Sequence, residues 1–194
     1  MSLRSGLTPG FTDPVAEAQS AFRALLEAMS HPGRVMRLAS DLVPPAPLCL
    51  SAGAVLLTLA DAETPVWLDA GPLADEWALF HAGCPLEDAA AQAQFVLATG
   101  TPPPLDTLSP GTDEEPHRSA TLILQVAALE EGKGWRLAGP GIEEQHRLRV
   151  EGLPPGFAAD WARNHARFPM GVDLILCAGD RIAALPRTTS ITEG

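Results

Sequence analysis

Asp173 and Arg187 are the charged residues of this chain whose types and spacing best fit a defined chemistry. Asp173 lies in the apolar segment 168–176, on the strand face that it shares with Ile175 and Cys177. A buried carboxylate requires hydrogen bonds or a cation, and Arg187 stands just past the expected partner strand. In pyridoxal enzymes a strand aspartate often holds the pyridinium nitrogen. A pyridoxal enzyme also needs a lysine to anchor the cofactor, and this chain offers no suitable one. The pattern therefore favours a structural ion pair or a main-chain clamp for Asp173.

Lys133 is the only lysine among the 194 residues, and it stands between Gly132 and Gly134. Glycines at these positions are typical of a solvated hairpin turn. Schiff-base chemistry and pyridoxal phosphate anchoring require a lysine in a desolvated pocket. A phosphate-binding P-loop requires serine or threonine directly after its lysine. The sequence therefore argues against these enzyme classes, and we expect no cofactor.

Arg187, Thr188 and Thr189 combine a guanidinium group and two hydroxyls near the C-terminus. Such a set can bind an anionic ligand. It can equally dock the C-terminal tail on its own domain or on another subunit. Docking is the favoured interpretation, and all three residues are candidates for ligand or subunit contact, as is Asp173.

Ser30 and His31 are adjacent at the end of an expected helix. Sequence neighbours rarely form a nucleophile and base pair, and an imidazole at a helix end often contacts unpaired carbonyls. We keep Ser30 and His31 as candidate ligand or subunit contacts and assign no catalytic residue. The five histidines show no spacing for a tetrahedral metal site. Segment 139–144 predicts a tight turn, because Pro140 lacks the amide that a phosphate loop needs.

Composition narrows the class of protein. The chain has 13 basic and 24 acidic side chains, a formal net charge of −11, and 46% hydrophobic residues. The basic residues are scattered, which argues against nucleic-acid binding. Three widely spaced cysteines suit a reducing compartment. With neither a signal peptide nor an apolar run of about 20 residues, we expect a cytoplasmic protein away from membranes.

The elements that must position these residues alternate between helix and strand. Asp13 and Pro14 predict a helix start, and Val15, Ala18, Phe22, Leu25, Leu26 and Met29 predict its apolar face. Further helices are expected from Ser51, Pro72 and Pro155, that from Pro72 with Leu73, Trp77 and Phe80 on one face. Strands are expected at 34–38, 65–68, 94–98 and 121–126, at 135–137 pairing with 121–126, and in a hairpin of 172–177 and 181–185.

These elements predict an α/β fold with a mixed sheet covered by helices. We expect one domain over residues 1–194. About the first 12 residues and the proline-rich loop 100–118 are expected to be mobile.

Seven segments in fixed order resemble one known family. They are 19–33 (QSAFRALLEAMSHPG), 55–61 (VLLTLAD), 64–68 (TPVWL), 120–126 (ATLILQV), 137–142 (LAGPGI), 168–176 (FPMGVDLIL) and 185–189 (LPRTT). The set is similar to the H subunit of the bacterial carbon–phosphorus lyase system, the PhnH family.

The resemblance implies a fold similar to pyridoxal-phosphate-dependent transferases but without the cofactor site. It implies a homodimer that joins the G, I and J subunits in a core complex. That complex converts alkylphosphonate and ATP to ribose 1-phosphonate 5-triphosphate and releases adenine. The J subunit, with its iron–sulfur cluster, later cleaves the carbon–phosphorus bond. This chain lacks a cysteine triplet for such a cluster.

The function expected from the resemblance is an accessory subunit without independent turnover. The alternative is an active transferase that binds a nucleotide or a phosphonate in a degenerate pyridoxal-type fold.

Overall fold

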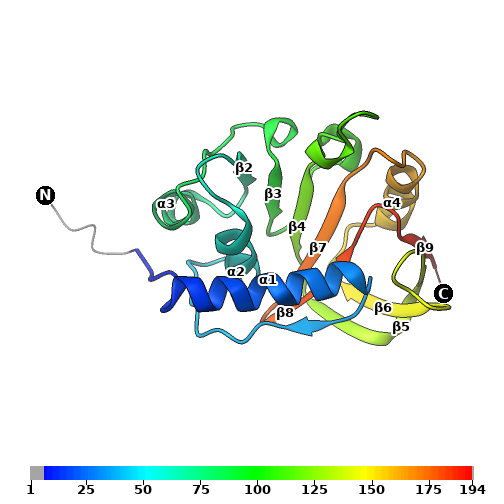
Figure 1. Ribbon diagram of the computed structural model, residues 1–194, viewed down its shortest axis with the longest axis horizontal. Helices are drawn as coiled ribbons and strands as arrows, with labels where there is room; N and C mark the ends of the chain where they lie inside the picture. Colours follow the sequence, from blue (N-terminus) through cyan, green and yellow to red (C-terminus); the bar gives the residue numbers. More distant parts are fainter. Residues whose placement is uncertain (1–6, 194) are drawn as a thin grey trace, which may run out of the picture.

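The computed structural model describes residues 7–193 (Figure 1). Its α-helices are α1 (Pro14–Ser30), α2 (Leu50–Leu59), α3 (Pro72–His81) and α4 (Phe157–His165). Short 3-10 helices are η1 (Ala90–Gln92), η2 (Leu105–Thr107) and η3 (Pro116–Arg118). The strands are β1 (Met36–Arg37), β2 (Val66–Leu68), β3 (Phe95–Ala98), β4 (Thr121–Gln125), β5 (Ala128–Ala138), β6 (His146–Glu151), β7 (Asp173–Ala178), β8 (Arg181–Leu185) and β9 (Ser190–Thr192).

Six strands form a mixed sheet in the order β1-β8-β7-β4-β3-β2. Strands β2, β3, β4 and β7 are parallel, whereas β8 is antiparallel to β7 and β1 is antiparallel to β8. This arrangement confirms the α/β class with a mixed sheet and helices. The hairpin of β7 and β8 is also confirmed. A second, antiparallel sheet in the order β6-β5-β9 was not expected from the sequence.

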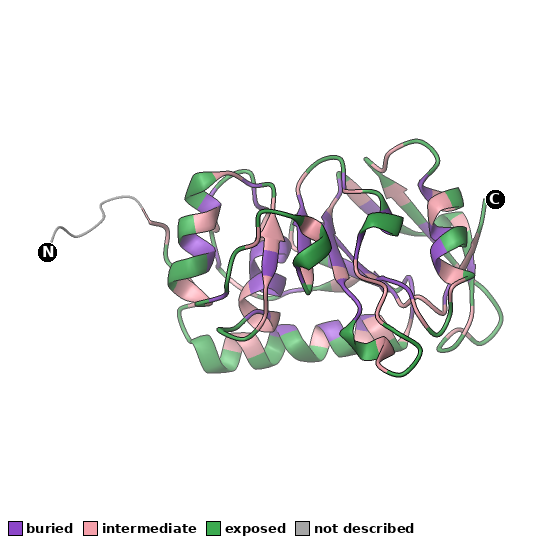
Figure 2. Cartoon of the chain, turned by 90° about the horizontal axis from the view of Figure 1, so that it is seen from above, coloured by how far each residue is buried: buried purple, intermediate pink, exposed green. Residues whose placement is uncertain are grey.

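Two hydrophobic cores lie on opposite faces of the six-stranded sheet, because successive strand residues point to opposite sides. Ile123 and Ile175 contribute to the core beneath α1, α2 and α3. Leu122 and Leu174 contribute to the core that α4 and the three-stranded sheet cover. Figure 1 shows α1 crossing the lower part of the molecule, with α4, β5, β6 and β9 gathered toward the C-terminal end. Buried positions follow the strands and the inner helix faces (Figure 2).

Helix α1 begins where the sequence predicts, but its buried face differs from the predicted one. The Asp13 carboxylate caps the helix by accepting a hydrogen bond from the Ala16 amide at 3.0 Å. Ala21, Leu25 and Ala28 are buried. The predicted face was wrong for three large residues, which are exposed: Val15 (69%), Phe22 (45%) and Leu26 (53%). The small alanines let α1 approach the core closely. The prediction was wrong because it assigned the largest apolar side chains to the buried face.

Helix α3 shows the same deviation. Its buried face comprises Ala74, Trp77 and Ala78. Leu73 and Phe80, which the sequence placed on the core side, are 62% and 73% exposed. At this helix, too, alanines are buried in the core while larger apolar side chains are exposed. Only Trp77 of the predicted face lies in the core.

The strand around Trp135 has different partners from those predicted. Strand β5 continues through Lys133 and pairs with β6 and β9, not with β4. Glu131 and Trp135 both lie opposite Leu148, so the glycines beside Lys133 form a bulge within the strand and not a hairpin turn. The Lys133 side chain is solvent-exposed, as expected, and its Nζ lies 2.9 Å from Glu130 Oε1. Parallel strands β3 and β7 occupy both edges of β4, so no edge remained for β5.

The proline-rich loop 100–118 contains η2 and η3 and is anchored by Leu105 and Leu108, which are 5% and 2% exposed. The Gly171 amide also donates to the Pro110 carbonyl at 2.8 Å. Mobility of this loop stays a prediction, as does the single-domain organisation. Of the N-terminal segment expected to be mobile, residues 1–6 lie outside the described residues. No helix within residues 7–193 combines the length and apolarity that crossing a membrane requires.

Candidate functional site

The Asp173 carboxylate and the Arg187 guanidinium form a largely buried ion pair. Their side chains are 17% and 12% exposed, and Arg187 Nη2 lies 2.6 Å from Asp173 Oδ2. Asp173 Oδ1 accepts from both the Arg187 backbone amide at 2.7 Å and Nε at 3.1 Å. The carboxylate therefore pairs with a side chain and clamps a main chain. Both interactions confirm what the sequence favoured.

The Arg187 guanidinium uses its remaining donors on neighbouring segments. Nη1 donates to the Pro116 carbonyl at 2.8 Å and to the Pro169 carbonyl at 3.4 Å. Nη2 also donates to the Ser119 hydroxyl. Because a guanidinium carries five N–H groups, these contacts together with Asp173 engage it completely. An incoming anion would have to displace internal partners, so this cluster holds the start of β7, the end of loop 100–118 and the tail together.

Thr188 and Thr189 follow the ion pair and run against α4. The Trp161 indole N–H donates to the Thr189 carbonyl at 2.8 Å. His165 Nδ1 lies 2.8 Å from the Arg187 carbonyl. Thr189 is fully buried, and its hydroxyl has no partner among the described residues. The tail docks on its own domain, one of the two docking modes that the sequence allowed. A ligand or subunit contact at Thr188 or Thr189 stays a prediction.

The glycine turn 139–141 packs against both predicted contact segments, residues 30–31 and residues 187–189. A Cβ added at Gly141 would lie 2.2 Å from the Ser30 carbonyl oxygen, and one added at Gly139 would lie 2.7 Å from the Thr188 carbonyl oxygen. The turn is thus in backbone contact with Ser30 on one side and with Thr188 on the other. Segment 139–142 forms a turn after a strand, as the sequence predicted. Tertiary folding brings together segments that are far apart in the chain.

Ser30 and His31 end α1, and their hydrogen bonds are those of a helix terminus. Ser30 Oγ donates to the Glu27 carbonyl at 3.1 Å and lies 3.1 Å from His31 Nδ1. The Glu27 carboxylate also lies 3.2 Å from this same Nδ1. A catalytic triad requires the nucleophile and the carboxylate on different ring nitrogens. This geometry caps the helix and does not activate the serine.

Two cavities lie near these segments. One of about 400 Å³ opens beside the α1 terminus and is lined in part by His31, Arg34, Ile142, Glu144 and His146. The residues described include no set of three side chains placed to hold a metal ion.

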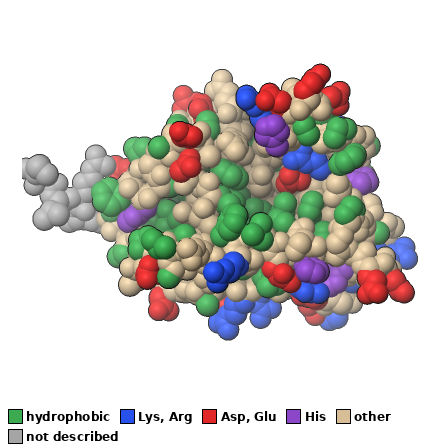
Figure 3. Space-filling model, in the orientation of Figure 1, with side chains coloured by type: hydrophobic (Ala, Val, Ile, Leu, Met, Phe, Trp, Pro, Cys, Tyr) green, Lys and Arg blue, Asp and Glu red, His purple; other side chains and the backbone are tan. Residues whose placement is uncertain are grey.

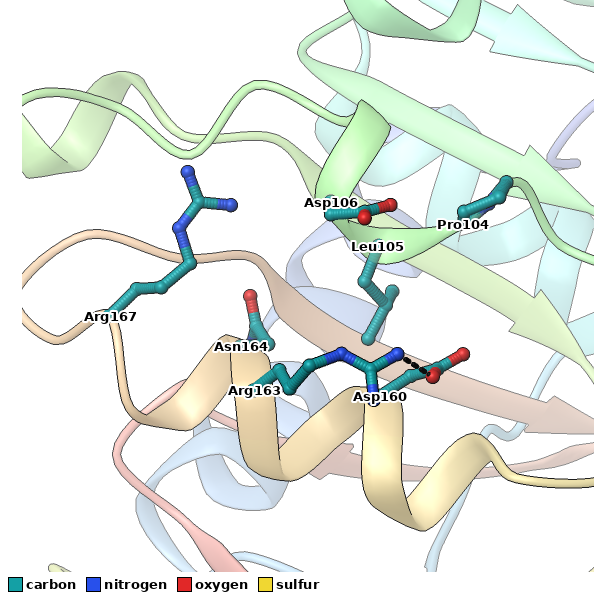
Figure 4. Close-up of a pocket in the computed structure, with 7 residues that line it drawn as sticks. All are labelled: Pro104, Leu105, Asp106, Asp160, Arg163, Asn164 and Arg167. Atoms are coloured by element: carbon teal, nitrogen blue, oxygen red, sulfur yellow. Dashed lines mark hydrogen bonds and ion pairs between the residues drawn. The ribbon is translucent and has the colours of Figure 1, made fainter.

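The second cavity, of about 130 Å³, lies between η2 and α4 (Figure 4). Arg163 forms an ion pair with Asp160, while Arg167 extends on the other side of Asn164. Two arginines face two aspartates, Asp106 and Asp160, so the lining is balanced in formal charge.

Asn164 is a buried polar residue that sequence reasoning missed. Its side-chain amide donates to the Val172 carbonyl and its oxygen accepts from the Val172 amide, both at 2.8 Å. Ser119, the hydroxyl partner of Arg187, was also missed. Ser119 is 68 residues from Arg187 along the chain, Asn164 is 8 residues from Val172, and neither belongs to a motif that the sequence analysis used. By contrast, Cys177 is buried in the core as predicted, and burial raises the pKa of its thiol well above the ordinary value.

The face in Figure 3 has a hollow near its centre with hydrophobic side chains gathered around it. Over all described residues, the large exposed apolar side chains include Val15, Phe22 and Leu26 on α1 and Leu73 and Phe80 on α3. Exposed apolar side chains mark a surface that contacts other proteins where they form one contiguous patch.

Comparison with known proteins gives a consistent result over nearly the whole chain. The family model described as "Bacterial phosphonate metabolism protein (PhnH)" matches residues 9–192. A protein of Rhizobium meliloti (strain 1021), named alpha-D-ribose 1-methylphosphonate 5-triphosphate synthase subunit PhnH, is 41% identical over 98% of both chains. A Stutzerimonas stutzeri protein, named putative C-P lyase subunit protein HtxG, is 39% identical over 89% of this chain and 85% of its own. The chain therefore belongs to the PhnH family of bacterial phosphonate metabolism proteins.

Proposed function

We propose that this chain is an accessory subunit of a carbon–phosphorus lyase core complex. In that complex, alkylphosphonate and ATP are converted to ribose 1-phosphonate 5-triphosphate with release of adenine. The observation that carries the proposal is the full-length match to the Rhizobium meliloti synthase subunit, 41% identical over 98% of both chains. The match to a second protein named as a C-P lyase subunit supports the same role.

The internal chemistry of the candidate residues agrees with an accessory role. The Arg187 guanidinium is engaged with Asp173, Ser119 and main-chain carbonyls. Ser30 and His31 are engaged with the end of α1. These hydrogen bonds stabilise segments of the chain, which supports an accessory role; contact of these residues with a ligand or a subunit stays a prediction. The alternative, an active transferase with its own nucleotide or phosphonate site, is not favoured.

Four finer points belong to the same proposal. They are a homodimer, association with the G, I and J subunits, a cytoplasmic location, and a fold similar to pyridoxal-phosphate-dependent transferases without their cofactor site. The exposed apolar residues of α1 and α3 offer surface for the subunit contacts. Phe22 and Leu26 are one helical turn apart and Val15 lies on the same side, so they can act together.

Reconstitution tests the proposal. The chain would be co-expressed with the G, I and J subunits of its own source, purified through a tag on another subunit, and assayed for adenine release from ATP and methylphosphonate. We expect this chain in a fixed ratio with the others, and adenine release only when all are present. Adenine release by the chain alone that requires methylphosphonate as the acceptor would establish the transferase alternative. Absence of the chain from the purified complex would overturn the accessory role.

A further inference from the structure

The outer face of the three-stranded sheet carries two arginines directly opposite each other. Arg136 of β5 and Arg147 of β6 are paired across the antiparallel ladder. Both side chains are exposed, whereas their neighbours Leu137 and Leu148 point into the core and are fully buried. Across the other edge of β5, Arg136 lies opposite Thr192, which is uncharged. The two guanidinium groups therefore share one solvent-facing row.

Neither guanidinium is neutralised within residues 7–193. Neither has a carboxylate within ion-pair distance, although nearby cations are paired. Arg149, two residues along β6, lies 2.7 Å from Glu151 and 3.9 Å from Glu130. Glu130 and Glu151 on these strands are thus engaged by other cations, and Glu131 lies 3.5 Å from His146 Nε2. This is unexpected in a chain with 24 acidic and 13 basic residues.

Two like charges directly opposite each other destabilise an antiparallel pair of strands. Within residues 7–193 no carboxylate lies close enough to either guanidinium to offset this cost. An external anion would remove the repulsion and gain charge-assisted hydrogen bonds from both guanidinium groups. The arrangement thus presents a cationic site to the surroundings.

The shape of this face selects the kind of anion. The arginines line neither of the two cavities described above, and they project from the outer side of a sheet. Small ligands bind in concave sites that bury most of their surface, whereas an open sheet face fits the surface of another protein. Carboxylate side chains on such a surface match the two guanidinium groups.

We propose that the Arg136–Arg147 face docks an acidic segment of another protein subunit. The inference deepens the proposed function, and it rests on that function for the identity of the partner, a subunit of the same complex. The attraction between opposite charges accelerates encounter and excludes partners that present a basic surface. The local cost in the free chain is offset on assembly.

The first test uses the isolated full-length chain. A double variant, Arg136→Gln with Arg147→Gln, is compared with the matched double variant Arg118→Gln with Arg163→Gln. The matched arginines are exposed, and each is paired with an acid three residues earlier. Each double variant loses two positive charges, so the two variants have the same net charge. We expect the melting temperature to rise for the Arg136/Arg147 variant and to stay level or fall for the control. A melting temperature that falls equally in both would overturn the repulsion argument.

The second test measures binding of an oligo-glutamate peptide at low and at physiological salt. We expect the wild type and the control to bind with a strong salt dependence, and the Arg136/Arg147 variant to lose about tenfold or more in affinity. Inorganic tripolyphosphate serves as a small-anion probe. Binding of tripolyphosphate without binding of the peptide would overturn the protein-surface assignment in favour of a small-anion site. Equal peptide binding by all three proteins would overturn it altogether.

The third test returns to the co-expressed complex. We expect the control variant to assemble with the other subunits, and the Arg136/Arg147 variant to dissociate more readily as salt is raised. If the wild type assembles and the Arg136/Arg147 variant matches it at every salt concentration, the docking inference fails while the proposed function stands. If the wild type itself does not assemble, the proposed function and the assignment of the partner both fail.

Discussion

Two regions of this molecule differ in whether their arginine side chains have internal partners. At the junction of β7 and the tail, Arg187 is 12% exposed and engages Asp173, Ser119 and two carbonyls. On the outer face of the three-stranded sheet, Arg136 and Arg147 are exposed and oppose each other without a partner in the described chain. The first region uses its charge to hold the chain together. The second leaves charge available to a partner.

The difference follows from desolvation. A guanidinium that leaves water must recover its hydration through hydrogen bonds and an opposite charge, so a buried arginine is stable only with a complete set of partners. An exposed arginine stays hydrated and tolerates an incomplete set at modest cost. Whether all N–H groups of a guanidinium have internal partners therefore distinguishes a structural arginine from one available for recognition.

Arg187→Ala should have the largest effect, because it breaks the complete cluster. Removing one partner of a buried ion pair leaves Asp173 uncompensated and costs about 3–5 kcal/mol. Urea unfolding of the purified chain would measure the loss. The control Arg163→Ala removes an arginine from an exposed pair and should cost about 0–1 kcal/mol. Similar losses for both variants would show that the Arg187 cluster does not act as a buried clamp.

Gly141→Ala should have the next largest effect, because it separates the two segments that the glycine turn joins. Gly141 has a φ of +85°, and its added Cβ would meet the Ser30 carbonyl at 2.2 Å. The positive φ alone costs alanine about 1–3 kcal/mol, and the contact with the Ser30 carbonyl adds to that cost. Gly132→Ala is the control, since Gly132 has a φ of +83° and no atom within 4 Å of its Cβ position. The melting temperature should fall further for Gly141→Ala, and equal shifts would argue against a close contact.

Arg147→Gln should stabilise the free chain slightly and so sharpen the contrast with Arg187. Relief of a like-charge cross-strand pair is worth about 0.2–1 kcal/mol, with the opposite sign to the loss at Arg187. Urea unfolding at low salt would detect the gain, which should shrink as salt screens the repulsion. Arg149→Gln is the control, because it breaks contacts with Glu151 and Glu130 and should not stabilise. A loss of stability in Arg147→Gln would mean that this arginine has an internal stabilising role.

Glu17 allows the smallest test, a pH dependence at a half-buried carboxylate. The Ser40 hydroxyl, and then the Asp13 amide, lower the pKa of Glu17 below its ordinary value of 4.5. A lowered folded-state pKa contributes stability that is fully present above 4.5 and is lost as the pH falls through the folded-state value. Unfolding of Glu17→Gln should therefore depend less on pH in this acidic window than unfolding of the wild type. If the exposed-loop control Glu114→Gln flattens the profile equally, the Ser40 contact is not its cause.

Local signals predicted much of the fold. Asp13 and Pro14 marked the start of α1 because capping depends on adjacent residues. The Asp173–Arg187 contact was accessible for a related reason: a hairpin returns the chain to its start, so residues across β7 and β8 meet. The partners Ser119 and Asn164 carried no such signal, since their positions depend on how loop 100–118 and α4 pack.

The sequence by itself determined the α/β class, the family, the lack of a second lysine and the pairing of Asp173 with Arg187. These depend on composition, local capping and alternation along single strands. Only the tertiary structure decided that β5 leaves the main sheet, that alanines of α1 face the core, and that Arg136 lies opposite Arg147. Strand partners and buried helix faces are set by competition among distant segments for the same apolar surface, and that competition has no signature within one segment.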